Sequence, residues 1–325
     1  MTAGQTAVPE AADVSVVICA YTEERWTLLE AAVASAQRQV PAPAEVVVVV
    51  DHNAGLHDRL ADRFDDVLLL HNANRRGLAG ARNTGLAASS AEVVAFLDDD
   101  ARAEPGWVAG HARHYRDPAV VGVGGAVHPD WQYPPPPRFP EEFAWVVGCT
   151  HSGIRPQVHQ IRNPIGANMS FRRSSIEAVG GFREGLGRIG SVPLGCEETE
   201  LSIRVARRVA DARIVYDPTV SVLHHVPEQR TSWEYFRRRC WGEGLSKAHV
   251  SQLAGARSGL SEERGYVSKT LPAGIGRSIR EATKLRDHHQ LARAGAIIAG
   301  LAVTTGGYLT GRVRASMAGG PDDGW

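Results

Sequence analysis

The feature that most constrains this chain is an apolar run that stops at three consecutive carboxylates. Residues 93–97 read VVAFL and are followed directly by Asp98, Asp99 and Asp100. A short apolar run with polar boundaries is typical of a buried strand in a parallel sheet. Ligands of open α/β sheets bind just beyond the carboxyl ends of such strands. The run therefore predicts a strand that delivers three acids to a ligand-binding edge.

Three adjacent carboxylates repel one another unless a cation neutralises them. Hard cations such as Mg²⁺ are commonly held by one or two carboxylates together with substrate phosphates. The triple acid therefore favours a site for a metal and a diphosphate. The alternative is an acidic loop tip that stays solvated or caps the helix expected near residue 105. Features elsewhere in the chain are needed to choose between a metal–diphosphate site and an acidic loop tip.

Apolar runs alternate with helical patterns through the first hundred residues. Residues 14–20 and 45–50 form two further apolar runs, and the second of them ends at Asp51. The same unit recurs in a run at 67–70 and a helical pattern at 78–88. Strands that alternate with helices imply a parallel sheet with right-handed crossovers. The predicted fold class is therefore α/β, with helices flanking a mostly parallel sheet.

A loop rich in glycine and arginine, residues 74–83, precedes the helix at 78–88. Glycines such as Gly77 allow a ligand to approach the backbone, and Arg82 adds positive charge at a helix N-terminus, which favours anions. The chain has no Gly-x-Gly-x-x-Gly after its first strand and no Walker pattern, which argues against a dinucleotide or P-loop site. We interpret the individual glycines as turn residues and Arg82 with Asn83 as a functional pair.

The composition excludes several classes of protein. Thirty-six basic and 36 acidic residues give a formal net charge of zero, so no overall field points to nucleic acid. The four cysteines form no Cys-x-x-Cys pair, which argues against a disulfide framework and a zinc site and fits a reducing cytosol. Residues 1–13 lack the basic start and apolar centre of a secretory signal, and we expect a disordered tail and a cytoplasmic protein.

A second acidic group opens a later helix. Glu197, Glu198 and Glu200 lie in the first turn of a helical pattern that continues to residue 209. The helix dipole favours ionised carboxylates in such a turn. An ionised carboxylate could act as a general base, but stabilisation of the helix alone also accounts for the three acids.

In their order along the chain, these segments resemble glycosyltransferase family 2, whose members are inverting, nucleotide-sugar-dependent enzymes with the GT-A fold. The resemblance covers about residues 14–248. Its seven parts are CAYTE at 19–23, Asp51, GLAGARN at 77–83, DDD at 98–100, GANMSFR at 166–172, CEETEL at 196–201 and His224. Thr22 and His52 depart from the asparagine and the acid usual in the family, and Glu198 stands where an aspartate is common.

The resemblance implies a role for each matching residue. The nucleobase would be surrounded by Ala20, Tyr21, Glu23 and Asp51. The remainder of the donor would be contacted by Gly77, Arg82, Asp98 and Asp99. Mg²⁺ or Mn²⁺ would be bound by Asp100, with His224 as a further ligand. Glu198 would be the catalytic base, and Glu197 is the second catalytic candidate.

The implied activity is inverting transfer of a sugar from a nucleotide-diphosphate donor to a hydroxyl of a lipid-linked or cell-envelope glycan. Two alternatives stay open at this point. A sugar-nucleotide pyrophosphorylase would carry a glycine-rich, lysine-containing loop after the first strand, where this chain has YTEE at 21–24. A non-catalytic nucleotide-sugar or carbohydrate-binding module could dispense with both Glu198 and Asp100, which are present.

We expect a catalytic domain over residues 14–250 and a helical C-terminal region over 251–325. Residues 294–311 carry no charge, but they are rich in alanine, glycine and threonine, whereas a spanning helix needs ~20 predominantly apolar residues. Basic residues precede this stretch, at positions 277, 280, 284, 286 and 293. The pattern favours peripheral contact with the inner face of the cell membrane over a span.

Overall fold

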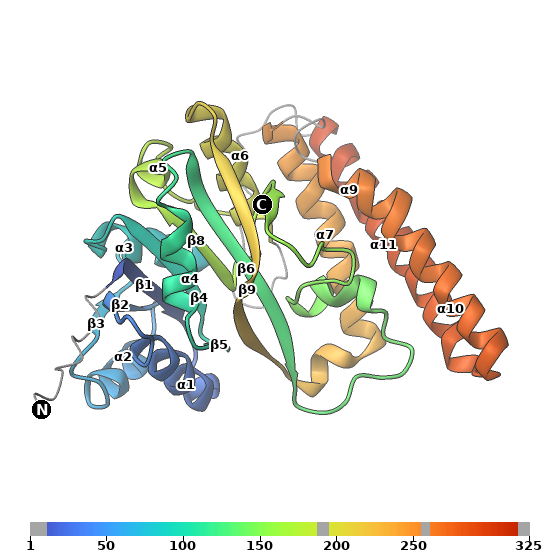
Figure 1. Ribbon diagram of the computed structural model, residues 1–325, viewed down its shortest axis with the longest axis horizontal. Coiled ribbons are helices and arrows are strands. Elements are labelled where there is room, and N and C mark those ends of the chain that lie inside the picture. The colour runs from blue at the N-terminus through green and yellow to red at the C-terminus, as the bar shows by residue number, and fades with distance from the viewer. Residues whose placement is uncertain (1–11, 187–194, 255–260, 318–325) are drawn as a thin grey trace, which may run out of the picture.

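The computed structural model describes residues 12–186, 195–254 and 261–317. A nine-stranded sheet runs through its first two thirds in the order β3-β2-β1-β4-β8-β6-β9-β5, and β7 pairs with β9 beside this path (Figure 1). Strand β1 already begins at Ala12, so the last two residues of the expected tail belong to the sheet, and residues 1–11 lie outside the described part.

The N-terminal half of the sheet is parallel, as the alternation of apolar runs and helical patterns predicts. Neighbouring strands β3, β2, β1 and β4 all run in one direction. The strands are β1 (Ala12–Ala20), β2 (Pro43–Val50), β3 (Leu68–His71) and β4 (Val93–Asp98), and the helices between them are α1 (Trp26–Gln37), α2 (Ala54–Ala61) and α3 (Leu78–Ala88). All carboxyl ends of these four strands therefore meet at one edge.

The second half adds antiparallel pairs. Strand β8 lies antiparallel between β4 and β6, and β5 and β7 pair antiparallel with β9, whereas β6 and β9 are parallel. The strands are β5 (Ala101–Ala103), β6 (Val120–Trp131), β7 (His159–Ile161), β8 (Asn168–Arg172) and β9 (Arg213–Val226), and the helices are α4 (Trp107–His114), α5 (Arg173–Glu177) and α6 (Glu197–Arg208). The GT-A-like mixed α/β sheet is thus complete at β9.

Strand β9 joins two stretches that the sequence suggests are separate strands, 213–216 and 220–223. Its register against β6 shifts between the pairs Gly125–Asp217 and Ala126–Ser221. The fully buried carboxylate of Asp217 accepts hydrogen bonds from Arg113, His114 and Thr219, so the irregular residues are satisfied without leaving the sheet. The polar residues that look like a turn in the sequence are a bulge inside one strand.

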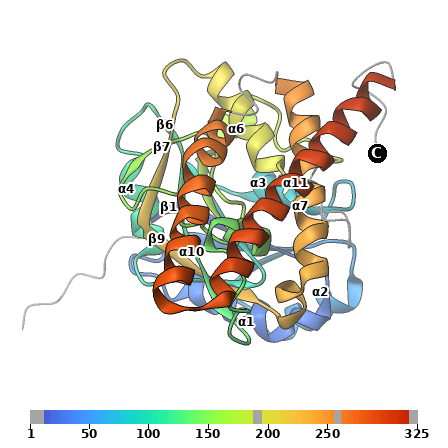
Figure 2. The ribbon, with the colours of Figure 1, turned by 90° about the vertical axis from the view of Figure 1, so that its right-hand side faces the viewer.

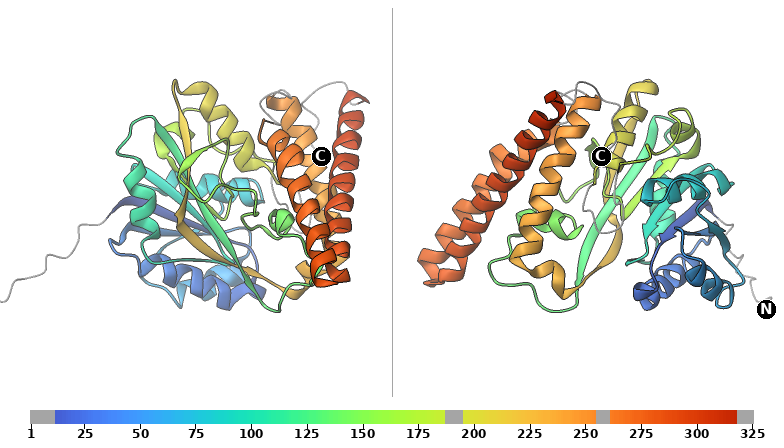
Figure 3. Two further views of the ribbon diagram at one scale, coloured as in Figure 1. Left: turned by 45° about the vertical axis from the view of Figure 1, so that its right-hand side comes forward. Right: turned by 180° about the vertical axis from the view of Figure 1, so that it is seen from behind.

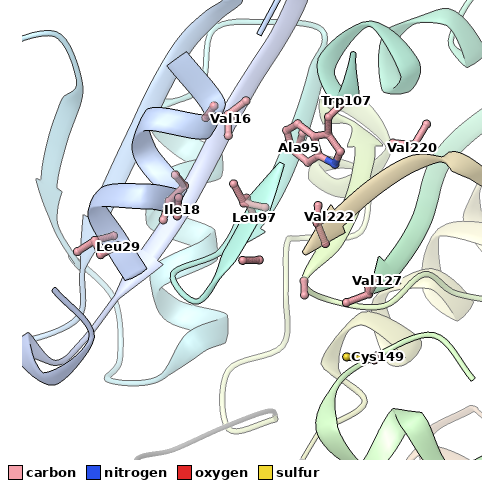
Figure 4. Packing of buried hydrophobic residues seen from close by; sticks show 14 of the residues in the cluster. Val16, Ile18, Leu29, Ala95, Leu97, Trp107, Val127, Cys149, Val220 and Val222 are labelled. Atoms are coloured by element: carbon pink, nitrogen blue, oxygen red, sulfur yellow. The ribbon is translucent and has the colours of Figure 1, made fainter. Parts of the chain in front are cut away.

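The core lies on both faces of the sheet. In Figure 4, Val16, Ile18 and Leu97 of the parallel half and Val127 and Val222 of the second half belong to one cluster. Five consecutive valines of β2 are buried, as expected for a strand covered on both faces. Full burial of a valine side chain stabilises the fold by about 1.5–3 kcal/mol relative to an exposed one, so these strands stabilise the parallel half of the sheet.

The buried amide of Asn168 joins the two halves. Its Oδ1 accepts a hydrogen bond from Trp107 Nε1 at 2.8 Å, and its Nδ2 donates to the carbonyls of Ala126 and Val220 at 2.8 and 2.9 Å. His111 also lies against Oδ1, at 3.2 Å, and burial lowers its pKa to about 3. The imidazole is therefore a neutral core group, and this network fixes β8 between β4 and β6.

The C-terminal helices pack beside the second half of the sheet in successive layers. The described elements are the short helices η2 (Glu141–Val147) and η3 (Glu228–Thr231), followed by α7 (Trp233–Ala254), α9 (Ser261–Gly265), the π-helical turn η4 (Tyr266–Thr270), α10 (Leu271–Leu285) and α11 (His288–Met317). Figures 2 and 3 show α10 and α11 as the outer pair, with α7 between them and the sheet.

These C-terminal helices pack onto the catalytic part. Helix α7 continues without a break across residue 250, and Leu271 and Ile297 are buried in the same core cluster as β1. A Cβ atom on Gly244 of α7 would lie 2.2 Å from the Thr304 carbonyl oxygen of α11, so the two helices touch backbone to backbone. Among the described helices, α11 is long and apolar enough to cross a membrane by length and composition, with a third of its most apolar window buried.

Candidate active site

The carboxyl ends of β1, β2 and β4 bring the predicted donor residues together. The Asp51 amide, just after β2, donates to the Ala20 carbonyl at 2.7 Å. The Asp51 carboxylate accepts from the Gly77 amide at 2.9 Å and from Asn72 Nδ2 at 2.7 Å. His52 Nδ1 lies 2.9 Å from the same carboxylate. Asp51 therefore fixes the loop before α3 and lines the edge where the resemblance places the nucleobase.

Two other predicted donor residues lie on the open side of this edge. Tyr21 is 44% exposed, and the Arg25 guanidinium lies 5.5 Å from the centroid of its ring. Glu23 is also exposed, and its carboxylate faces Arg59 at 3.6 Å. An exposed ring beside a strand end is free to stack on a planar ligand such as a nucleobase.

The triple acid and the late histidine meet through strand pairing. Strand β5 follows the triple acid directly and pairs with β9 so that Ala101 lies opposite His224. The His225 amide donates to the Asp100 carbonyl at 2.8 Å. Asp98, Asp100 and His224 each offer a ligand atom, and these atoms all lie within 4.8 Å of one another. The structure thus gathers residues that are more than 120 positions apart in the sequence.

Two arginines also contact the acids of this cluster. Arg25 Nη1 lies 2.8 Å from Asp99 Oδ1 and 3.1 Å from Asp100 Oδ2, and Arg230 Nη2 lies 3.3 Å from Asp100 Oδ2. Burial alone would raise the pKa of Asp100, but His224, Arg25 and Arg230 hold it well below the usual range. Burial and the adjacent Asp100 raise the pKa of Asp99, although Arg25 opposes them.

The cluster fits a hard divalent cation. Two carboxylates and an imidazole form a donor set that suits Mn²⁺ or Mg²⁺. The second oxygen of Asp99 is buried and has no hydrogen-bond partner among the described residues. The His224 ring is held from behind, since a Cβ atom on Gly148 would lie 3.1 Å from its Cε1, and Cys149 Sγ lies 3.8 Å from Nδ1. Such support orients the imidazole toward Asp100.

Arg82 connects the strand edge to α6. The guanidinium is buried, with Nη2 3.4 Å from Asp98 Oδ1 and 3.1 Å from the Gly166 carbonyl, and with Nη1 2.9 Å from Glu197 Oε1. A buried arginine needs such partners because an unpaired charge is costly to bury. One side chain of the predicted loop thus joins Asp98, the segment before β8 and the first residue of α6.

The acids at the start of α6 differ in their surroundings. Glu197 is buried and paired with Arg82, and Glu200 is buried and paired with Arg204 at 2.8 Å. Glu198 is half-buried, without an ion pair among the described residues. Burial and the carboxylate of Glu197 raise the pKa of Glu198 to about 8. The sequence suggests that the helix dipole keeps Glu198 ionised, but burial next to a second carboxylate outweighs the dipole.

Several residues at this edge are missing from the sequence prediction. Arg25, Arg230 and Asn72 contact the predicted acids directly. Arg25 follows two glutamates in a helical turn, and Arg230 lies in a polar stretch after β9, so both have the pattern of solvated side chains. The one indication in the sequence is that three adjacent carboxylates need neutralising, so basic partners must come from other segments of the chain.

A parallel sheet edge with an acid after β2, a cluster of carboxylates and histidine, and a further acid at a helix start is the arrangement expected of a GT-A glycosyltransferase. The comparisons agree with this class. A profile described as glycosyl transferase family 2 matches residues 15–180. The chain is 37% identical over 244 residues to a glucosyl-dolichyl phosphate glucuronosyltransferase of Haloferax volcanii, covering 74% of this chain and 78% of that protein. The chain belongs to glycosyltransferase family 2.

More distant relatives extend the same picture. A pre-mycofactocin glycosyltransferase of Mycobacterium tuberculosis is 30% identical over 192 residues, which cover 58% of this chain and 39% of that protein. The mannosyltransferase PcManGT of Pyrobaculum calidifontis, solved with GDP-Man and Mn²⁺, shares the fold with a TM-score of 0.54 at 22% identity, covering 91% of this chain and 87% of that one. GalNAc-T7, solved with UDP, GalNAc and Mn²⁺, gives 0.51 at 16% identity over 79% and 54% of the two chains.

The predictions of the family, the GT-A fold class and an enzyme that uses a nucleotide-sugar donor are therefore confirmed. The comparisons therefore favour a glycosyltransferase over the two alternatives that the residues alone left open, the pyrophosphorylase and the non-catalytic binding module. The roles of individual site residues remain predictions.

Proposed function

We propose that this glycosyltransferase moves its sugar to a hydroxyl of a lipid-linked or cell-envelope glycan in a single inverting displacement. Glu198 is the general base, and Asp98, Asp100 and His224 hold Mg²⁺ or Mn²⁺. The observation that carries the proposal is the position of Arg82, which contacts Asp98 and Glu197 together. That bridge brings the start of α6, which includes Glu198, close to the carboxyl end of β4, and this supports a role for Glu198 next to the donor.

The chemistry requires one proton transfer. An acceptor hydroxyl becomes a good nucleophile when a carboxylate takes its proton in the transition state, which contributes typically about 10²–10⁴-fold to the rate. The proton passes to Glu198, the acceptor oxygen bonds to the anomeric carbon, and the bond to the diphosphate oxygen breaks. A bound divalent cation would neutralise the departing diphosphate. A carboxylate with a pKa of about 8 is a stronger base than an ordinary glutamate once it is ionised.

Support for a lipid-linked or envelope acceptor comes from the relatives. The Haloferax protein is named for a glucosyl-dolichyl phosphate acceptor. A succinoglycan biosynthesis protein, ExoM of Rhizobium meliloti, is 26% identical over 273 residues, covering 77% of this chain and 83% of that protein. The first name gives a lipid phosphate as the acceptor, and the second gives a role in succinoglycan biosynthesis.

The outer face of α11 supports contact with the inner surface of the cell membrane. Leu291, Ile298 and Leu309 project from it and are each more than half exposed. Of the basic residues expected to face lipid, Arg277 and Arg293 instead pair with the buried carboxylate of Glu142. Three remain exposed near the turn between α10 and α11, namely Arg280, Lys284 and Arg286. Each could contribute about 1 kcal/mol next to an anionic leaflet.

Point substitutions test the membrane contact better than truncation, because α10 and α11 bury core residues. Replacement of Ile298 and Leu309 by glutamine should reduce co-sedimentation with vesicles that contain anionic lipid and leave the melting temperature within a few degrees. Replacement of exposed Val158, far from α11 in sequence, is the control. Equal sedimentation of all three proteins would remove the membrane from the proposal.

The variant Glu198→Gln tests the base. It keeps the size of the side chain and removes its basicity, so we expect normal folding, nearly normal binding of Mn²⁺ and of the nucleoside diphosphate, and transfer reduced by at least about 10²-fold. The wild-type product should have the anomeric configuration opposite to that of the donor. The exposed Glu177→Gln, on α5, is the matched control. Retained transfer by Glu198→Gln, or a product of retained configuration, contradicts the assignment.

A further inference from the structure

We infer that Ser246 and Glu243, on α7, are positioning residues for the catalytic base at the start of α6. This inference rests on the proposed role of Glu198. It makes the C-terminal helical layer a part of the catalytic apparatus, in addition to any contact that its outer face makes with lipid.

The backbone just before the acids of α6 has an unusual conformation. Cys196, which precedes Glu197, has a φ of 74° and lies in the left-handed region. A residue with a Cβ atom pays roughly 1–2 kcal/mol for that conformation, and glycine avoids the cost. Such a residue keeps its conformation only when the surrounding structure holds it. No side chain of α6 itself caps this helix start.

Helix α7 supplies the contacts that hold this turn. The Ser246 hydroxyl accepts a hydrogen bond from the Gly195 amide at 3.2 Å, and the Cys196 thiol contacts Glu243 Oε1 at 3.8 Å. Ser246 and Glu243 are three residues apart and therefore share one face of α7. The left-handed residue and the residue before it are thus both tied to a single turn of a different helix.

That turn of α7 is itself held by a cluster of partly buried charges. Lys247 Nζ lies 3.0 Å from Glu243 and 2.6 Å from Glu263, and Arg162 makes two contacts to Glu263 at 2.8 and 3.0 Å. Arg239 also lies near Glu243, at 3.7 Å. Ion pairs with this many partners restrict the side chains to one arrangement. The cluster joins α7 to α9 and to the strand segment around β7.

The opposite face of the same turn packs against α11. Gly244 lies between Glu243 and Ser246, and its Cα side touches the backbone of Thr304 and Gly307. Because backbone meets backbone there, the turn cannot move toward solvent without displacing α11. The support for the start of α6 therefore extends from the charge cluster on one side to the outer helix on the other.

Glu243 also acts on Glu198 through its charge. The charged groups that face Glu198 are Glu197 on its own helix, Arg82 on α3 and Glu243 on α7. The two carboxylates raise the pKa of Glu198, and Arg82 opposes them. Neutralising Glu243 should therefore lower the pKa of the base, an effect that a purely structural contact would not produce.

The experiment compares Ser246→Ala and Glu243→Gln with two controls on α7. Ser251→Ala removes a buried hydroxyl that has no partner among the described residues, and Glu234→Gln removes an exposed carboxylate. We expect Ser246→Ala to lower kcat about tenfold with the donor KM within about twofold, because displacement of a reacting group by 1 Å costs as much as about 10²-fold. For Glu243→Gln we expect the acid limb of the kcat profile to move to lower pH.

The outcomes separate this inference from the proposed function. Transfer retained by Glu198→Gln removes the base and, with it, this inference. If Glu198→Gln is inactive while Ser246→Ala and Glu243→Gln match the controls in kcat and in pH profile, the base stands and the positioning role is wrong. If donor KM rises as much as kcat falls, the two residues act on donor binding, and the positioning role is wrong. Melting curves of all variants identify losses that come from unfolding.

Discussion

The two acidic regions of the site carry the same kind of side chain in opposite electrostatic settings. At the strand edge, Asp100 faces His224, Arg25 and Arg230, which hold its pKa well below the usual range. At the start of α6, Glu198 is half-buried beside Glu197, and its pKa is raised to about 8. The first setting keeps a carboxylate ionised, and the second raises the affinity of a carboxylate for a proton. Environments that push pKa values apart assign different roles to like residues.

The two regions also obtain their surroundings from different parts of the chain. The strand edge is built by β4, β5 and β9, with Arg25 and Arg230 beside its acids. The start of α6 depends on Arg82 from one side and on α7 from the other. The comparison therefore predicts that substitutions at the edge act on metal and donor, whereas substitutions on α7 act on the proton transfer.

The largest expected effect is that of Asp100→Asn. It removes a charge from the proposed cation site, and a metal can supply several kcal/mol of transition-state stabilisation. A loss of about 4 kcal/mol corresponds to about 10³-fold in rate. We expect loss of measurable Mn²⁺ binding by calorimetry together with that loss of transfer. His224→Ala should cost less, since water can take one coordination position.

Two results would contradict this prediction. Full transfer by the wild-type protein in excess EDTA would show that no metal is needed. A stronger effect from His225→Ala than from His224→Ala would show that the wrong histidine was chosen. Asp130→Asn, which removes an exposed carboxylate paired with Arg102, is the control for loss of charge on this side of the molecule.

Much of the strand edge is predictable because it depends on local pattern. Apolar runs end where the strands end, so Asp51 and Asp98 are placed correctly by periodicity and by the rule that carboxyl ends of parallel strands share an edge. The pairing of Asp100 with His224 is beyond periodicity, since it depends on β5 and β9 meeting across the fold. There, only the resemblance to a family signals that the two residues meet.

The surroundings of α6 are the least predictable part of the site. Glu243, Ser246 and Lys247 lie in a helical stretch of mixed polarity, and nothing in their spacing distinguishes a buried charge cluster from a solvated face. The dipole argument for Glu198 omits burial, which raises the pKa and which the sequence does not reveal. Long-range packing decides the pKa of Glu198, and no single segment of the sequence indicates that packing.

Glu263→Gln tests the charge cluster that supports the start of α6, because this variant should lower the stability of the folded protein. Burial alone would raise the pKa of Glu263, but Lys247 and Arg162 lower it to about 2. The ionised group thus contributes stability that is fully present above its unfolded pKa of about 4.3 and is lost as the pH falls from there toward 2. Breaking a buried ion pair costs about 3 kcal/mol, and a large domain loses on the order of 2 °C in Tm per kcal/mol.

We therefore expect Glu263→Gln to melt about 6 °C below the wild type at pH 7, with the gap narrowing between about pH 4.5 and pH 2. Thermal melts followed by circular dichroism across that range provide the measurement. A gap that stays constant with pH would mean that the carboxylate is not ionised in the cluster. Glu234→Gln, exposed on α7, should show no gap.

The smallest expected effect has opposite signs for two ligands. Arg25 is partly exposed and contacts both Asp99 and Asp100, so a cation must share these acids with it. Partly exposed ion pairs are worth up to about 1 kcal/mol, or about fivefold in affinity. Arg25→Ala should therefore bind Mn²⁺ alone up to about fivefold more tightly. The same variant should bind a nucleoside diphosphate in the presence of Mn²⁺ more weakly, because a guanidinium beside the cluster is a natural partner for phosphate oxygens.

Arg63→Ala, which removes an exposed arginine paired with Glu30, should change neither affinity. Weaker binding of Mn²⁺ alone by Arg25→Ala would show that the arginine mainly holds the acids in place, and the strand edge would then depend on outside support as the start of α6 does.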